Sequence, residues 1–203
     1  MGAMKGRLAW SRTWLLVGLA IAGSLGAQHA VAEQDDEAEA VFTASRQTPL
    51  ADGGVCVAGG EAIDGVDSRA VLLVKKGAAV RQRIKLPLPD PDYSGASAVG
   101  CLQLGSAWYA VEELDTSSFV SDKQVLLFVD RIERGRLVKR VMLPVRYAGQ
   151  NSGVARVERG KAGFALDAAG RLLVSGKVYP DALGGSQGKP FVVRLTPDLT
   201  VLK

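Results

Sequence analysis

The sequence predicts an all-β protein with three consecutive blade-like units, each an antiparallel β-meander. Three observations support this fold class. From residue 53 onward, short apolar segments are separated by Gly, Pro, Asp and Ser, which is typical of strands and turns. Apolar residues at helical spacing are nearly absent there. A similar order of strands and turns recurs over about residues 53–87, 98–144 and 154–203. We therefore expect a single β domain over residues 51–203.

The units are aligned by matching strands and turns. Residues 53–55 correspond to 106–108 and 170–172, and residues 71–74 correspond to 125–128 and 191–194. The turns at 76–77, 134–135 and 197–198 also match. Each unit supplies about four strands, which is the content of one β-propeller blade.

The first unit is expected to contain strands at residues 55–58, 70–75 and 79–86. The last of these alternates with period two, which is typical of a half-exposed outer strand. Its apolar face is predicted to carry Val80, Gln82, Ile84 and Leu86, and its cationic face Arg81, Arg83 and Lys85. We expect the cationic row to be a solvated edge that blocks aggregation, with the docking of a polyanion as the alternative.

The second unit is expected to contain strands at residues 98–104, 107–113, 124–130 and 136–143. The third begins with a strand at 154–158 and a further strand from residue 164 to a tight turn at 167–170. A strand at 171–179, a Gly-rich loop, and a hairpin of 191–195 with 199–203 complete it.

The third unit resembles the delta-60 type of bacterial β-propeller repeat. The matching residues are 167–176 (DAAGRLLVSG) and 191–198 (FVVRLTPD). Leu199 stands where the repeat has Gly, and the Asp-x-x-Phe ending is absent. The resemblance implies a four-stranded blade in a protein of the cell envelope or exterior. It implies no activity, because the repeat carries no catalytic residues.

Three blades are too few to close an ordinary ring, since propellers use about four to eight. Three outcomes are open. The chain pairs with another copy, the N-terminal residues complete a degenerate fourth blade, or the strands form a twisted β-sandwich or barrel. The fold prediction is therefore a partial or small β-propeller, with a sandwich or barrel as the alternative.

Residues 1–32 have the pattern of a secretory signal peptide. Basic residues precede an apolar run at 14–25, and Ala30-Val31-Ala32 has the small-x-small pattern of a cleavage site. The run is shorter than the roughly 20 residues that span a bilayer, so we expect no stable membrane span after cleavage. Residues 33–50 begin with an acidic run and are expected to form a flexible tail.

Charge and cysteine content also bear on the class of protein. The chain has 25 basic and 21 acidic residues, but three of the basic residues lie in the signal segment. The rest is nearly neutral, which argues against nucleic-acid binding. Cys56 and Cys101 are the only cysteines, and in an exported protein they are expected to form a disulfide. Two separate buried thiols are the alternative.

The sole histidine, His29, lies in the signal segment. Ser-His-Asp and Cys-His nucleophilic chemistry and histidine-based metal sites are therefore excluded for the remaining chain. Clustered carboxylates leave open a calcium ion or an acid–base pair; they are Asp64, Asp67, Asp90, Asp92, Glu112, Glu113 and Asp115. Turn formation explains the aspartates equally well. Otherwise we expect no cofactor.

Two further patterns in the sequence could indicate a functional site. Residues 184–189 (GGSQGK) contain a Ser186-x-x-Lys189 spacing, but companion motifs are missing, so a hairpin loop is expected. Trp108, Tyr109 and Tyr179 could stack on a sugar ring, although aromatic strand residues usually belong to the core.

The functional expectation is a periplasmic or secreted protein that acts as a non-catalytic binding or scaffolding module of the bacterial cell envelope. No catalytic, cofactor-binding or metal-ligating residue is assigned. The alternative is a histidine-independent carboxylate hydrolase or lyase that acts on glycans through Glu112, Glu113 and Asp115. The expected partner is a protein or glycan of the envelope, and self-association of the chain is left open.

Overall fold

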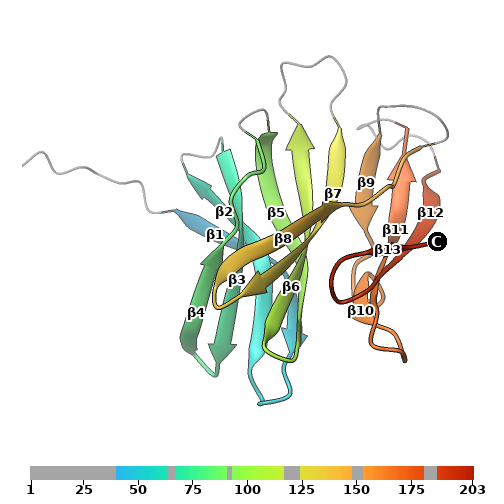
Figure 1. Ribbon diagram of the computed structural model, residues 1–203. Helices are drawn as coiled ribbons and strands as arrows, with labels where there is room; N and C mark the ends of the chain where they lie inside the picture. Colours follow the sequence, from blue (N-terminus) through green and yellow to red (C-terminus); the bar gives the residue numbers. More distant parts are fainter. Residues whose placement is uncertain (1–39, 64–66, 91–92, 117–123, 148–152, 181–186) are drawn as a thin grey trace, which may run out of the picture. The chain divides into compact units, whose positions relative to one another are not determined.

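The computed structural model describes residues 40–63, 67–90, 93–116, 124–147, 153–180 and 187–203, and it is all-β (Figure 1). The predicted signal peptide at 1–32 and the acidic run at 33–39 lie outside these residues. The strands are β1 (Val41–Pro49), β2 (Val55–Ile63), β3 (Asp67–Lys76), β4 (Ala79–Lys85), β5 (Tyr93–Leu104), β6 (Ala107–Thr116), β7 (Val125–Glu133), β8 (Arg136–Met142), β9 (Val154–Val157), β10 (Phe164–Leu166), β11 (Leu172–Tyr179), β12 (Lys189–Leu195) and β13 (Val201–Leu202). Within the described ranges, no helix is long and apolar enough to cross a membrane.

The thirteen strands belong to one mixed sheet, and their antiparallel pairings form three runs. Run 1 consists of β1–β4 and run 2 of β5–β8, each strand pairing with the next along the chain. In run 3, β9 and β10 both pair with β11, which is followed by β12 and β13. The predicted meander order is present in runs 1 and 2, whereas in run 3 β9 pairs with β11 and not with β10.

Single parallel bridges join the runs. Ser68 of β3 pairs with Gly95 of β5, and Val125 of β7 pairs with Val154 of β9. In both cases the third strand of one run meets the first strand of the next. The sheet does not close into a barrel, and the described strands form no closed propeller ring.

The hairpins correct the sequence alignment of runs 1 and 2. Two-residue turns close the β3–β4 and β7–β8 hairpins at the pairs Lys76–Ala79 and Glu133–Arg136, respectively. These closing pairs lie 57 residues apart, as do Ser68 and Val125 at the parallel bridges. The alignment of residues 71–74 with 125–128 was therefore wrong by three positions. Both segments are apolar, so composition did not fix their register, whereas turn geometry does.

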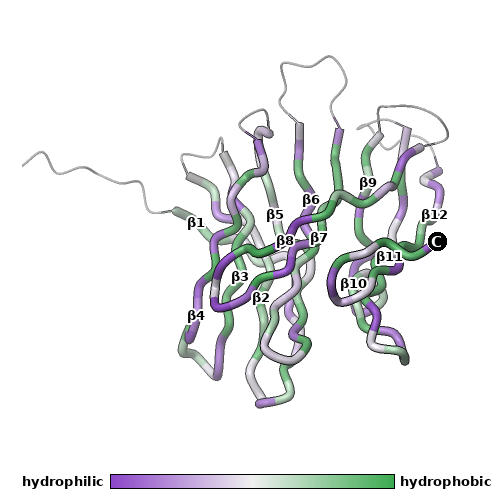
Figure 2. Tube along the Cα trace, in the orientation of Figure 1, coloured by the Kyte–Doolittle hydropathy of each residue, from purple (hydrophilic) through white to green (hydrophobic). Residues whose placement is uncertain are grey.

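A β-bulge also changes the predicted face of β4. The pairing with β3 skips Arg81, and the pairing of β8 with β7 skips Val138 at the equivalent position. A bulge residue interrupts the period-two alternation of a strand. Ile84 and Leu86 are buried as predicted, but Val80 is 51% exposed. Much of β4 is coloured as hydrophilic in Figure 2. Its cationic side chains form ion pairs, with Arg81 bound to Asp52 and with Arg83 and Lys85 bound to Glu61.

Strand β1 differs most from the sequence expectation. Its residues were placed in the flexible tail at 33–50, yet residues 41–49 pair with β2 along its whole length. The segment contains few large apolar residues, and most of its side chains are exposed. Its placement depends on backbone hydrogen bonds to β2. Hydrophobic periodicity in the sequence does not reveal such bonds. Run 1 thereby gains its first strand.

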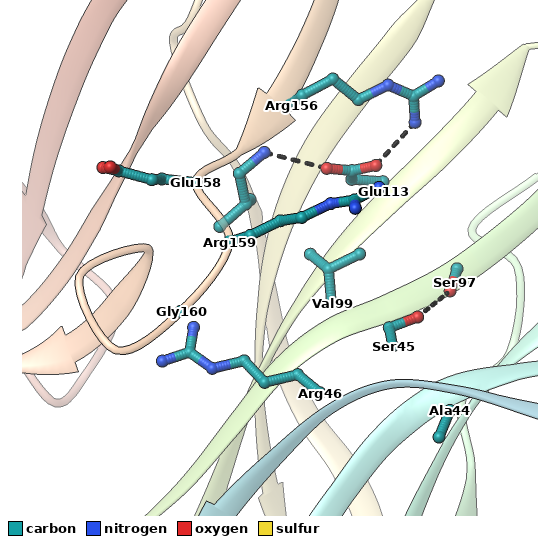
Figure 3. Close-up of a pocket in the computed structure, with 11 residues that line it drawn as sticks. Ala44, Ser45, Arg46, Ser97, Val99, Glu113, Arg156, Glu158, Arg159 and Gly160 are labelled. Carbon is teal, nitrogen blue, oxygen red and sulfur yellow. Dashed lines mark hydrogen bonds and ion pairs between the residues drawn. The ribbon is translucent and has the colours of Figure 1, made fainter.

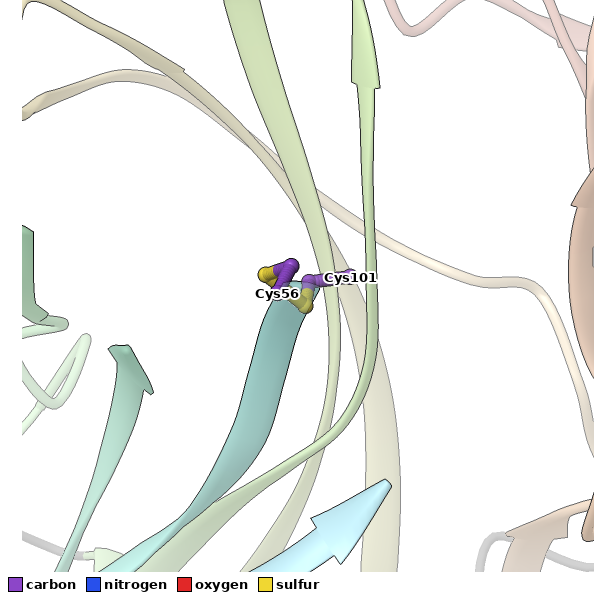
Figure 4. Close-up of a disulfide and its surroundings, with 2 residues drawn as sticks. All are labelled: Cys56 and Cys101. Carbon is purple, nitrogen blue, oxygen red and sulfur yellow. A yellow bond between two sulfur atoms is a disulfide. The ribbon is translucent and has the colours of Figure 1, made fainter. Parts of the chain in front are cut away.

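Two apolar cores lie between the runs. The first packs β2, β3 and β4 against β5, β6 and β7, and it includes Leu72, Ile84, Trp108 and Phe128. The disulfide between Cys56 of β2 and Cys101 of β5 crosses this core, which confirms the predicted bridge (Figure 4). The second core packs run 2 against run 3 and includes Tyr109, Val129, Leu172 and Leu195. Run 2 thus contributes to both cores.

Candidate functional site

A pocket of about 780 Å³ is lined by residues from the first strands of all three runs. Strand β1 contributes Ser45 and Arg46, β5 contributes Ser97, and β9 contributes Arg156; Glu113 comes from β6 (Figure 3). The segment after β9 completes the lining with residues 158–160. We call this region the inner cleft. Its volume lies within the range typical of small-molecule sites, roughly 300–1,000 Å³.

Two β-bulges lie at the inner cleft. The pairing of β1 with β2 passes from Ala44 to Arg46 and skips Ser45. The pairing of β5 with β6 passes from Ala98 to Gly100 and skips Val99, which also lines the cleft. Because a bulge restarts the alternation of faces, it re-aims the residues that follow it. In β1, the bulge turns Arg46 to the face opposite to that of Ala44.

Glu113 is held by two donors. Its Oε1 accepts a hydrogen bond of 2.9 Å from the Val157 amide, and its Oε2 lies 2.6 Å from Nη1 of Arg156. These contacts connect β6 of run 2 with β9 of run 3 across one wall of the cleft. The carboxylate is therefore a structural anion with both oxygens already in use.

Arg46 is anchored differently. Its Nη2 donates a hydrogen bond of 3.2 Å to the backbone carbonyl of Phe164. Its Nη1 is buried and has no hydrogen-bond partner. Burial lowers the pKa of Arg46, because water no longer solvates the full charge. The cleft therefore contains a cationic group with unused donor capacity.

The carboxylates that the sequence grouped together are separated in the structure. Adjacent residues of a strand point to opposite faces, so Glu112 and Glu113 lie on opposite sides of β6. Glu113 faces run 3, whereas Glu112 lies on the side of the first core. Asp115 is on β6 as well, and one of its carboxylate oxygens is buried without a hydrogen-bond partner.

Glu112 instead forms a buried cluster with Asp130 of β7 and Arg140 of β8, here called the acid–arginine cluster. Arg140 binds Asp130 through Nε and Nη2, both at 2.7 Å, and its Nη2 lies 3.1 Å from Glu112. Its Nη1 donates to the carbonyl of Pro87 in run 1 at 2.6 Å. Burial raises the pKa of Glu112 well above its usual range, and the neighbouring Asp130 charge adds to the effect. The folded protein therefore favours the protonated form of Glu112 more strongly than solvent does.

The remaining candidate residues are described only in part. Asp64, Asp92 and Ser186 lie outside the described residues. Lys189 lies over the Tyr147 ring, 4.8 Å from its centroid. Trp108 and Tyr109 are buried in the two cores, as expected for aromatic strand residues. No group of three or more His, Cys, Asp or Glu side chains that could hold a metal ion is found in the portion of the chain described here.

Sequence reasoning did not identify Arg46, Arg156 or Ser97. Arg46 lies in a segment that was assigned to the tail, and the other two residues belong to strands with no chemical motif around them. The two bulges that shape the cleft arise from pairing with β2 and β6. A single sequence contains no local signal for such pairing.

Comparisons with known proteins leave the structure as the basis for assigning function. No protein-family model, curated protein or solved structure matches the chain.

Proposed function

We propose that the protein is an exported, non-catalytic binding or scaffolding module of the bacterial cell envelope, with the inner cleft as its ligand site. The observation that carries this proposal is the pair of bulges at Ser45 and Val99, which both line the same pocket. Bulges are common next to functional sites, where they re-aim side chains. The bulge at Ser45 lies in run 1, and the bulge at Val99 lies in run 2.

The state of Glu113 supports a binding role over catalysis. A general base needs a carboxylate that is free to take a proton from a substrate. Both oxygens of Glu113 are engaged, by the Arg156 guanidinium and by the Val157 amide. Three meanders connected by equivalent bridges also support a partial β-propeller, as the delta-60 resemblance implies. Propeller-like folds commonly present their loops and strand ends to ligands.

Export to the periplasm or exterior is supported by two independent features. The first is the signal-peptide pattern of residues 1–32. The second is the disulfide between Cys56 and Cys101, since disulfides persist mainly in oxidising compartments. Fractionation of cells that express the full chain tests this part of the proposal. Recovery of the uncut chain in the cytoplasm would contradict it.

The binding role is tested by pull-down of envelope proteins and glycans with the purified protein. Ser97→Trp should fill the inner cleft and abolish capture of the cleft ligand, because an indole would occupy space between β1 and β5. Arg136→Trp is the matched control, since Arg136 is exposed on β8 and does not line the cleft. Equal capture by the wild type and both variants would refute the cleft as the site.

The acid–arginine cluster favours one alternative, a carboxylate hydrolase or lyase that acts on glycans. Two neighbouring carboxyl groups, one of them with a raised pKa, are the usual arrangement of a general acid and its partner. However, Glu112 and Asp130 are completely buried, so a glycan would reach them only after the first core opened. Any hydrolase activity that survives in Glu112→Gln would rule out this alternative.

A further inference from the structure

Arg46 places a positive charge in the inner cleft without a carboxylate partner among the residues that the structure describes. One terminal nitrogen binds the Phe164 carbonyl, while Nη1 is buried and unsatisfied. Burial lowers the pKa of Arg46, but a guanidinium remains protonated in proteins because its ordinary pKa lies far above neutrality. A cation withdrawn from water is normally paired with an anion. Arg46 can therefore take an acceptor group from a ligand that enters the cleft.

The charges around the cleft favour an anionic ligand. Three arginines line it, Arg46, Arg156 and Arg159, against two glutamates. Arg156 is neutralised by Glu113, whereas Arg159 has no ion pair within the described ranges. The second glutamate, Glu158, is exposed, and its carboxylate lies 3.5 Å from a serine hydroxyl of run 3. Two guanidinium groups that line the cleft, those of Arg46 and Arg159, are thus without a carboxylate partner within the described ranges.

Neutral polar groups also line the cleft. The hydroxyls of Ser45 and Ser97 are 3.2 Å apart and connect β1 with β5 (Figure 3). A serine hydroxyl can both donate and accept hydrogen bonds, so this pair can bind the hydroxyl groups of a ligand. Such groups are suited to a polar ligand that carries several hydroxyls.

We propose that the inner cleft binds an oxyanion carried by a hydroxyl-rich ligand, with Arg46 and Arg159 holding the anion and Ser45 and Ser97 contacting the hydroxyls. The ligand class is an acidic sugar with a carboxylate or a sugar phosphate. Guanidinium groups recognise both oxyanions through charge-assisted, often bidentate hydrogen bonds. This assignment rests on the proposed binding function and names its ligand chemistry.

Titration calorimetry at low ionic strength tests the assignment with glucuronate, glucose 6-phosphate, inorganic phosphate and neutral glucose. We expect at least one acidic sugar to bind more tightly than glucose and inorganic phosphate, with an affinity that falls as salt rises. A preference for glucuronate would identify a carboxylate as the anion, and the reverse order a phosphate. Equal affinities for glucose and the acidic sugars would overturn the proposal, as would an absence of binding by both acidic sugars.

Charge-removing variants locate the anion. Arg46→Gln and Arg159→Gln should each weaken binding of the preferred acidic sugar by about tenfold or more, the loss expected for a charge-assisted hydrogen bond. Arg159→Gln alters an exposed side chain, so it keeps the test valid if Arg46→Gln folds poorly. Arg81→Gln is the matched control, because Arg81 is an exposed arginine outside the cleft.

Unchanged affinity in Arg159→Gln and in folded Arg46→Gln would show that these arginines do not bind the anion. That result is distinguishable from failure of the proposed function. If Ser97→Trp still abolished capture of envelope material, the cleft would remain a binding site for a ligand of different chemistry.

Discussion

Replacing Arg140 by methionine should strongly destabilise the fold. The substitution keeps a long aliphatic side chain but removes the one cation of the acid–arginine cluster. Arg140 makes two contacts of 2.7 Å with Asp130, one of 3.1 Å with Glu112 and one of 2.6 Å with the Pro87 carbonyl. The side chains of Asp130 and Glu112 are 0% and 1% exposed, respectively, so water cannot replace the lost guanidinium. Breaking such a buried pair costs about 3–5 kcal/mol of unfolding free energy.

The matched control is Arg81→Met. Arg81 also lies 2.9 Å from a carboxylate, that of Asp52, but both side chains are about half exposed. Exposed ion pairs contribute about 0–1 kcal/mol, because solvent screens the charges and ordering the side chains costs entropy. Both substitutions remove one positive charge from an ion pair. The difference between their losses of unfolding free energy therefore measures the effect of burial.

Urea denaturation of the chain without residues 1–32 measures both effects. Trp108 is the sole tryptophan after residue 32, and it is buried in the first core. Its fluorescence therefore reports the separation of runs 1 and 2, which Arg140 connects through Pro87. Losses of similar size in Arg140→Met and Arg81→Met would refute the reasoning, since burial would then have no influence on the contribution of the ion pair.

Three further predictions concern the disulfide, a titrating group and a strand glycine. Replacing both Cys56 and Cys101 by alanine opens a 45-residue loop and should lower the unfolding free energy by about 4 kcal/mol, measured by urea denaturation against the oxidised wild type; a loss under 1 kcal/mol would contradict the chain-entropy account. Because the folded-state pKa of Glu112 is raised, wild-type stability should fall as pH rises from the ordinary glutamate range through that raised value. Glu112→Gln should reduce this loss of stability, measured by urea denaturation at several pH values across the same range. An equal pH dependence of the unfolding free energy in the wild type and the variant would contradict the prediction. Gly176→Ala places a Cβ 2.0 Å from the Arg156 carbonyl oxygen and should lower the unfolding free energy by about 1–3 kcal/mol. An unchanged melting temperature would show that β9 moves away from the new methyl group without loss of stability.

Most of the fold could be predicted because its signals are local. Turn residues such as Gly77 and Gly135 adopt positive φ angles that favour glycine, and they end the strands where composition indicates. Apolar segments between the turns formed strands in all three runs, although β4, β8 and β12 are largely exposed. Errors arose where pairing, and not composition, sets the structure: strand β1, the register between residues 71–74 and 125–128, and the exposed face at Val80.

The candidate site was not predictable for the same physical reason. Glu112 and Glu113 are neighbours in sequence, yet the pleat of β6 directs one into the first core and the other towards run 3. Conversely, Arg46 and Arg156 are 110 positions apart and line one pocket. Only the bulge at Ser45, created by the register between β1 and β2, turns Arg46 to its observed face.

The sequence by itself predicted the all-β class and most of the strand order, and it favoured a disulfide between Cys56 and Cys101, because strand alternation, turn chemistry and cysteine number are read along the chain. The tertiary structure decided which faces meet and which charges are buried together. Those outcomes depend on register between strands, and a shift of one residue moves every following side chain to the other face of the sheet. Two such shifts, at Ser45 and Val99, lie at the inner cleft.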